Sequence, residues 1–89
     1  MNVEVTVVTS VPPTAKDLDD LRLAASALAS KQDSIAVDVR EEKCQFLLTA
    51  SFKMKTTAQY KVVDLISAEF EYYLVSLKDY QETIISFPR

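Results

Sequence analysis

The 89-residue chain contains no glycine, no histidine and no tryptophan, and it has a single cysteine. Phosphate-cradling loops, dinucleotide-binding turns and nucleophile elbows all depend on the backbone freedom of glycine. Histidine is the usual general base near neutral pH and a common metal ligand. These absences argue against most nucleotide-dependent, hydrolytic and metal-dependent enzymes. We therefore expect a non-enzymatic protein with no catalytic residues, no metal site and no cofactor.

The lone cysteine, Cys44, cannot form an internal disulfide, which is typical of a protein in a reducing compartment. Its place in an alternating apolar pattern predicts a small buried core residue rather than a nucleophile. The first residues, MNVEVTVV, lack the basic segment and cleavage pattern of a signal peptide. No apolar run approaches the roughly 18 residues of a membrane span. The sequence thus predicts a cytoplasmic protein that does not enter a membrane.

Ten basic residues stand against thirteen acidic ones, for a formal net charge of -3. Binding to a nucleic-acid backbone needs a concentrated basic face, so nucleic acid is not expected to be the main partner. The basic residues are dispersed except around one predicted junction between a strand and a helix. That candidate basic patch consists of Lys53, Lys55 and Lys61.

Hydrophobic periodicity divides the chain into six elements. Alternating apolar residues predict strands over 2–9, 34–40, 43–55 and 82–88, and three- or four-residue spacing predicts helices over 14–31 and 57–80. Thr14 with Asp17 has the spacing of a helix capping box. The order βαββαβ in a single domain spanning residues 1–89 predicts a ferredoxin-like sandwich, in which two helices cover one face of a four-stranded antiparallel sheet.

The connection between the second and third strands, EEK at 41–43, is unusual for a hairpin. Tight two-residue hairpin turns need positive φ angles, which glycine adopts most readily. Because the chain has no glycine, we expect a four-residue type I turn here instead.

The second predicted helix carries two apolar stripes when its residues are placed at 100° intervals. The wider stripe should cover the sheet; it contains Val62, Val63, Ile66, Phe70, Tyr73, Leu74, Leu77 and Tyr80. The narrower stripe lies roughly opposite and is a candidate interface; it contains Leu65, Ala68, Tyr72 and Val75. Four apolar residues in register over three turns favour a contact with another protein, and Tyr72 is of the type that anchors interfaces.

The leading hypothesis is a small regulatory or adaptor protein that binds itself, as a homodimer, or one other protein through this narrower stripe. A dimer formed by the open face of the sheet is the rival geometry. The alternative is a small-ligand sensor similar in topology to ACT-type amino-acid-binding domains, with its pocket near Ser10, Val11 and Pro12. Their usual glycine in this loop is absent from the chain, so the resemblance is one of topology. The third hypothesis is RNA binding through the candidate basic patch.

Overall fold

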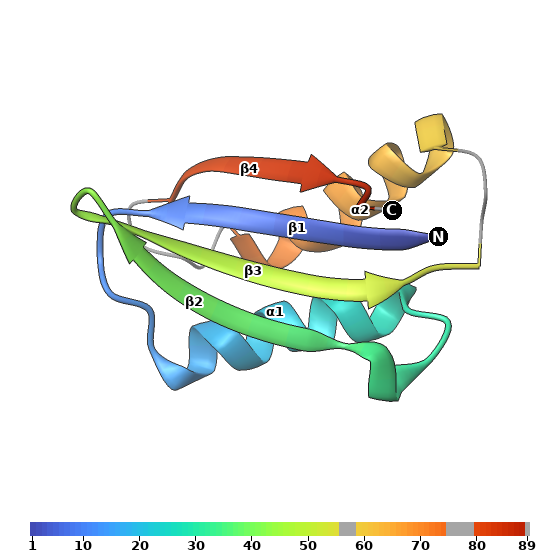
Figure 1. Ribbon diagram of the computed structural model, residues 1–89, viewed down its shortest axis with the longest axis horizontal. Helices are drawn as coiled ribbons and strands as arrows, with labels where there is room; N and C mark the ends of the chain where they lie inside the picture. Colours follow the sequence, from blue (N-terminus) through green and yellow to red (C-terminus); the bar gives the residue numbers. More distant parts are fainter. Residues whose placement is uncertain (56–58, 75–79, 89) are drawn as a thin grey trace.

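The computed structural model describes residues 1–55, 59–74 and 80–88, with the exception of the side chains of residues 59, 60, 72–74, 80 and 81. Its strands are β1 (Asn2–Thr9), β2 (Ala36–Glu42), β3 (Gln45–Lys53) and β4 (Tyr80–Ser86). Its helices are α1 (Ala15–Leu28) and α2 (Gln59–Leu74), and a short 3-10 helix (Gln32–Ser34) precedes β2. The sheet has the order β2-β3-β1-β4, and both helices lie on one of its faces (Figure 1). The predicted ferredoxin-like sandwich is therefore confirmed.

Strand β1 lies in the interior of the sheet and pairs with a neighbour on each side. It is antiparallel to β3 from the pair Asn2–Lys53 to the pair Thr9–Phe46, and antiparallel to β4 on its other edge. Every second residue of β1 up to Val7 points toward the helices and is buried, which explains the strict alternation at the start of the sequence.

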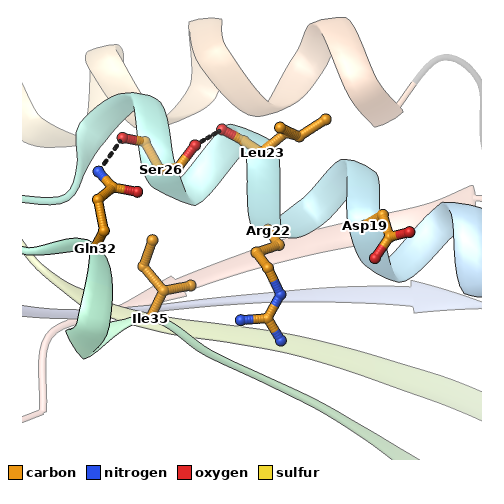
Figure 2. A pocket seen from close by; sticks show the side chains of 6 residues that line it. All are labelled: Asp19, Arg22, Leu23, Ser26, Gln32 and Ile35. Atoms are coloured by element: carbon orange, nitrogen blue, oxygen red, sulfur yellow. Dashed lines mark hydrogen bonds between the residues drawn. The ribbon is translucent and has the colours of Figure 1, made fainter.

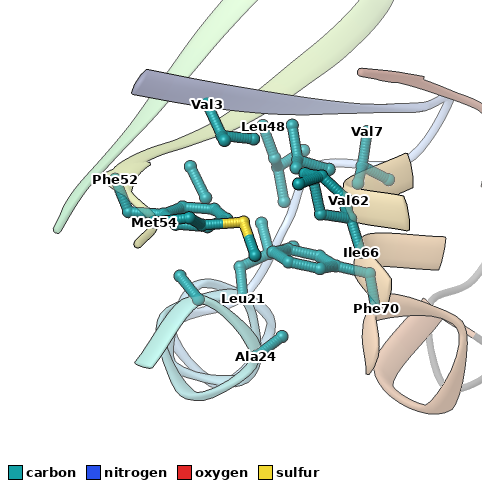
Figure 3. Packing of buried hydrophobic residues seen from close by; sticks show 13 residues of the cluster. Val3, Val7, Leu21, Ala24, Leu48, Phe52, Met54, Val62, Ile66 and Phe70 are labelled. Carbon is teal, nitrogen blue, oxygen red and sulfur yellow. The ribbon is translucent and has the colours of Figure 1, made fainter. Parts of the chain in front are cut away.

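The core lies between the sheet and the two helices (Figure 3). Its buried members are Val3, Val5, Val7, Leu21, Ala24, Ala25, Leu48, Ala50, Phe52, Met54, Val62, Ile66 and Phe70. The rings of Phe52 on β3 and Phe70 on α2 are stacked, with centroids 6.3 Å apart. This contact joins the sheet to the second helix at the centre of the core, so α2 has a fixed phase over the sheet.

Helix α1 begins with the predicted capping box. The Asp17 backbone N–H donates to the Thr14 hydroxyl at 3.3 Å, and the Thr14 N–H donates to the Asp17 carboxylate at 2.8 Å. The helix ends at Leu28, three residues earlier than predicted. The reason is a competing partner, because the Ser30 N–H donates to the Lys53 carbonyl of β3 at 2.7 Å.

The turn between β2 and β3 differs from the prediction. It is a two-residue turn of Lys43 and Cys44, with φ angles of 49° and 63°. Both residues adopt the left-handed region at a cost of about 1–2 kcal/mol each, and the seven residue pairs between β2 and β3 offset that cost. Consequently β2 continues to Glu42 rather than ending at residue 40. Cys44 is exposed in the turn, so its predicted burial in a strand is wrong.

The prediction of a helix over 57–80 is wrong at Tyr80. This residue is the first of β4, where it pairs with Thr9, and the described part of α2 covers Gln59–Leu74. Strand β4 runs from 80 to 86 rather than from 82 to 88. A single tyrosine at helical spacing fits either element, so the periodicity alone did not place this boundary. Within the described residues, neither helix has the length and apolar character needed to span a bilayer.

The strained turn leads to a stability prediction. We expect Cys44→Gly to raise the free energy of unfolding by about 0.5–1 kcal/mol, because glycine adopts positive φ without the steric cost paid by a side chain. Urea unfolding followed by circular dichroism measures this change. The matched control is Cys44→Ala, which removes the thiol but keeps a Cβ atom and should leave stability nearly unchanged. Equal stabilisation by both variants would show that the turn conformation is not the cause.

Candidate interaction surfaces

The buried side of α2 is narrower than predicted. Val62, Ile66 and Phe70 are fully buried, as expected, but Val63 is 38% exposed. Val63 is displaced by 100° from Val62 around the helix axis, so it projects sideways rather than toward the sheet. The assignment of Val63 to the core stripe is therefore wrong. The side chains of Tyr73 and Leu74 and the whole of Leu77 lie outside the described residues, and Tyr80 belongs to β4.

The candidate interface on α2 is described for two of its four residues. Leu65 is 51% exposed and Ala68 is also exposed, both on a side of α2 away from its buried stripe. Tyr72 has its backbone in α2, but its side chain, and the whole of Val75, lie outside the described residues. The two described members are therefore accessible to a partner.

Helix α1 adds a large apolar side chain that sequence reasoning did not include in the interface. Leu23 is 53% exposed, and Figure 2 shows it among the side chains that line a cavity on α1. The two helices pack side by side. The sequence does indicate that Leu23 is exposed, because this residue falls outside the apolar stripe of α1. A single leucine outside a stripe is nevertheless common on protein surfaces.

This cavity of about 360 Å³ lies between α1 and the 3-10 helix (Figure 2). It is lined by Asp19, Arg22, Leu23, Ser26, Gln32 and Ile35. The Gln32 side-chain amide donates to the Ser26 carbonyl at 2.9 Å, which ties the 3-10 helix to α1. A second cavity of about 230 Å³ lies beside the first residues of β1. Neither of these two cavities is lined by Ser10, Val11 or Pro12, the place predicted for a small ligand.

The open face of the sheet is polar at its centre. The hydroxyl groups of Thr6 and Thr49, on adjacent strands β1 and β3, lie 3.1 Å apart and share a hydrogen bond. Ile84 on β4 is 47% exposed, whereas Val8 is only 3% exposed between its neighbours on β3 and β4. Because the central hydroxyl groups of this face hydrogen-bond to each other, they do not require a partner to satisfy them. The exposed leucines of the helices are better candidates for a contact with another protein.

The three lysines of the candidate basic patch come from different segments. Lys53 is the last residue of β3, Lys55 follows it, and Lys61 lies in the first turn of α2; all three are exposed. Within the described residues, no group of three or more histidine, cysteine or acidic side chains is arranged to hold a metal ion.

Comparison with known proteins finds similarity in the fold and not in the sequence. No protein-family model matches the sequence, and no curated protein matches it. Among solved structures, the de novo designed protein Ferredog-Diesel is similar, with a TM-score of 0.50, 11% identity, and 98% of this chain and 85% of that chain covered. A Chloroflexus aurantiacus J-10-fl protein provisionally assigned as an antibiotic biosynthesis monooxygenase has a TM-score of 0.44 and 10% identity, over 100% and 94% of the two chains. At such identity the likeness to the designed protein concerns the fold alone.

Substitutions at two neighbouring valines test the rotation of α2 about its own axis. We expect Val62→Asp to lower the free energy of unfolding by about 3 kcal/mol or more, because it places an unpaired carboxylate in the core. Val63→Asp should change it by less than about 1 kcal/mol, since that position is reached by water. Chemical denaturation of the two variants provides the comparison. Equal losses would contradict the orientation of the helix.

Proposed function

We propose that this chain is a non-enzymatic interaction protein of the cytoplasm that associates with a second copy of itself through the outer surface of its helix layer. The observation that supports the proposal is the 51% exposure of Leu65, on a helix whose other side is fully buried in the core. The interface would contain Leu65 and Ala68, together with Tyr72 and Val75 as the sequence predicts. Leu23 of α1 would extend it onto the neighbouring helix.

The energetics favour covering this surface. Burying a leucine completely contributes about 1.5–3 kcal/mol relative to leaving it exposed, and both Leu23 and Leu65 have about half of their surface still to bury. In a symmetric dimer each leucine is buried twice, once on each copy. Symmetric dimers are also the commonest oligomers, because one surface patch serves both subunits. We therefore infer that a homodimer is favoured over a complex with a different protein.

A regulatory or adaptor role follows as part of the proposal. Such a protein acts through the partners that it brings together, so it needs a rigid contact surface rather than a catalytic group. A helix held against a sheet by core residues such as Ile66 and Phe70 provides that rigidity. Neither of the described cavities favours the small-ligand alternative at the predicted loop, and we do not extend the proposal to it.

The proposal predicts the effect of a charge at the centre of the surface. Leu65→Glu should lower the average mass in solution at the concentrations at which the wild type associates, because association would bury an unpaired carboxylate. Light scattering over a concentration series measures the mass. The far-ultraviolet circular dichroism spectrum should not change, since residue 65 is exposed and glutamate is a good helix former.

Ser67→Glu is the matched control. It adds the same charge to the same helix at an exposed position about 160° away from Leu65 around the axis. We expect this variant to retain the association of the wild type. If the two variants had the same mass at all concentrations, the helix surface would not be the interface. Partner capture with the wild type and with Leu65→Glu would then show whether the surface binds a different protein.

A further inference from the structure

We propose that the free edge of β2 is a second self-association surface, at which two copies of the chain pair their β2 strands antiparallel and form one continuous eight-stranded sheet. Strand β2 is at one end of the sheet order, with β3 on one side and no strand on the other among the described residues (Figure 1). This inference uses different residues from the helix surface and does not depend on the proposed function.

The tight turn determines which backbone groups of β2 face outward. In a two-residue hairpin the residues that flank the turn, Glu42 and Gln45, form a hydrogen-bonded pair. Hydrogen-bonded and non-hydrogen-bonded pairs alternate along an antiparallel ladder. The N–H and C=O groups of Val37, Val39 and Glu41 therefore point away from β3. These groups at the sheet edge are the template on which another strand can pair.

The charges of β2 select one register for a symmetric pair. When Val39 faces Val39 of the second copy, Asp38 faces Arg40, and by symmetry Arg40 faces Asp38. In this register the residues whose backbone groups point away from β3 also face one another, because Val37 lies opposite Glu41. Moving the register by two residues either way sets Asp38 against Asp38 or Arg40 against Arg40. Like charges directly opposite each other are unfavourable, whereas opposite charges stabilise a pair of strands.

The side chains involved are accessible. Asp38 and Arg40 are both exposed, and Val39 is 37% exposed at the helix-facing side of the edge. Arg40 makes a 3.5 Å ion pair with Glu42 of its own strand, at the solvent-exposed surface. Such exposed pairs contribute little and exchange readily. Pairing across the two-fold axis would cover Val39 with its own counterpart and supply two cross-strand ion pairs.

The other edge strand does not offer the same complementarity. The sequence of β4, YQETIIS, contains one charged residue, Glu82. A symmetric pair of β4 strands therefore has no opposite charge to match. Strand β2 contains no proline, whose missing N–H would block pairing at a sheet edge.

A charge-swap series tests the register, carried out in the Leu65→Glu background so that the helix surface does not contribute. We expect Leu65→Glu alone to dimerise through the edge. Adding Asp38→Arg should raise the dissociation constant by about tenfold or more, because each of two attractive pairs becomes a repulsive one. Adding Arg40→Asp as well should restore the dimer, since the charges are then opposite again. Analytical ultracentrifugation measures the three dissociation constants.

A proline substitution tests the backbone pairing separately. The proline test is made in the same Leu65→Glu background, with dimerisation measured by analytical ultracentrifugation. The N–H of Val39 is not needed by β3, so adding Val39→Pro should leave the chain folded while removing a hydrogen bond that the edge dimer uses twice. Val39→Thr keeps the N–H and the β-branched shape, and it should still dimerise. Circular dichroism and the thermal midpoint report the folded state of both variants. Amide hydrogen exchange should show protection at Val37, Val39 and Glu41 that rises with protein concentration.

Three results would overturn the proposal. The first is a Leu65→Glu variant that stays monomeric at all concentrations. The second is a folded Val39→Pro variant that dimerises as well as its threonine counterpart. The third is a double charge swap that fails to restore the association lost in the single swap, which would exclude the register even if the edge pairs in another way.

Discussion

The burial of a single sheet face under two helices is the constraint on which the rest of this molecule depends. Strand β1 supplies its centre, with Val3, Val5 and Val7 buried between β3 and β4 and under the helix layer. The stacked rings of Phe52 and Phe70 then fix α2 against β3. Because a chain of this size buries only a modest core, nearly every large apolar side chain on these faces is used. Those that remain exposed are therefore informative.

The absence of glycine has a structural consequence at the hairpin. Lys43 and Cys44 adopt positive φ angles despite the cost, because a tighter turn lets β2 and β3 pair along their full length. Strand β2 therefore continues to Glu42 and carries Asp38, Val39 and Arg40 along an open edge. The strained turn therefore sets the position of the edge that we propose for pairing between two copies. The alternation of hydrogen-bonded and non-hydrogen-bonded pairs between β2 and β3 decides which backbone groups of β2 point outward.

The two proposed surfaces differ in the physical interaction that each would use. The helix surface around Leu65 would associate by burying apolar area, whereas the β2 edge would associate through backbone hydrogen bonds and two ion pairs. In the proposal each would join two copies about its own two-fold axis. A chain that used both surfaces would form assemblies larger than a dimer, and salt should weaken the edge more than the helix surface.

The sequence by itself determined the order of elements, the buried residues of β1 and the capping box at Thr14, because alternation and capping are local properties of the chain. It also identified Leu65 and Ala68 as lying away from the core. Only the tertiary structure decided the bounds of β4, the tight turn that exposes Cys44, and the exposure of Val63. Each of these depends on contacts between distant segments, such as the pairing of Tyr80 with Thr9 and of Glu42 with Gln45. Periodicity carries no information about such contacts, so the fold class and the outer side of α2 could be predicted, while the β2 edge that we propose as a second surface could not.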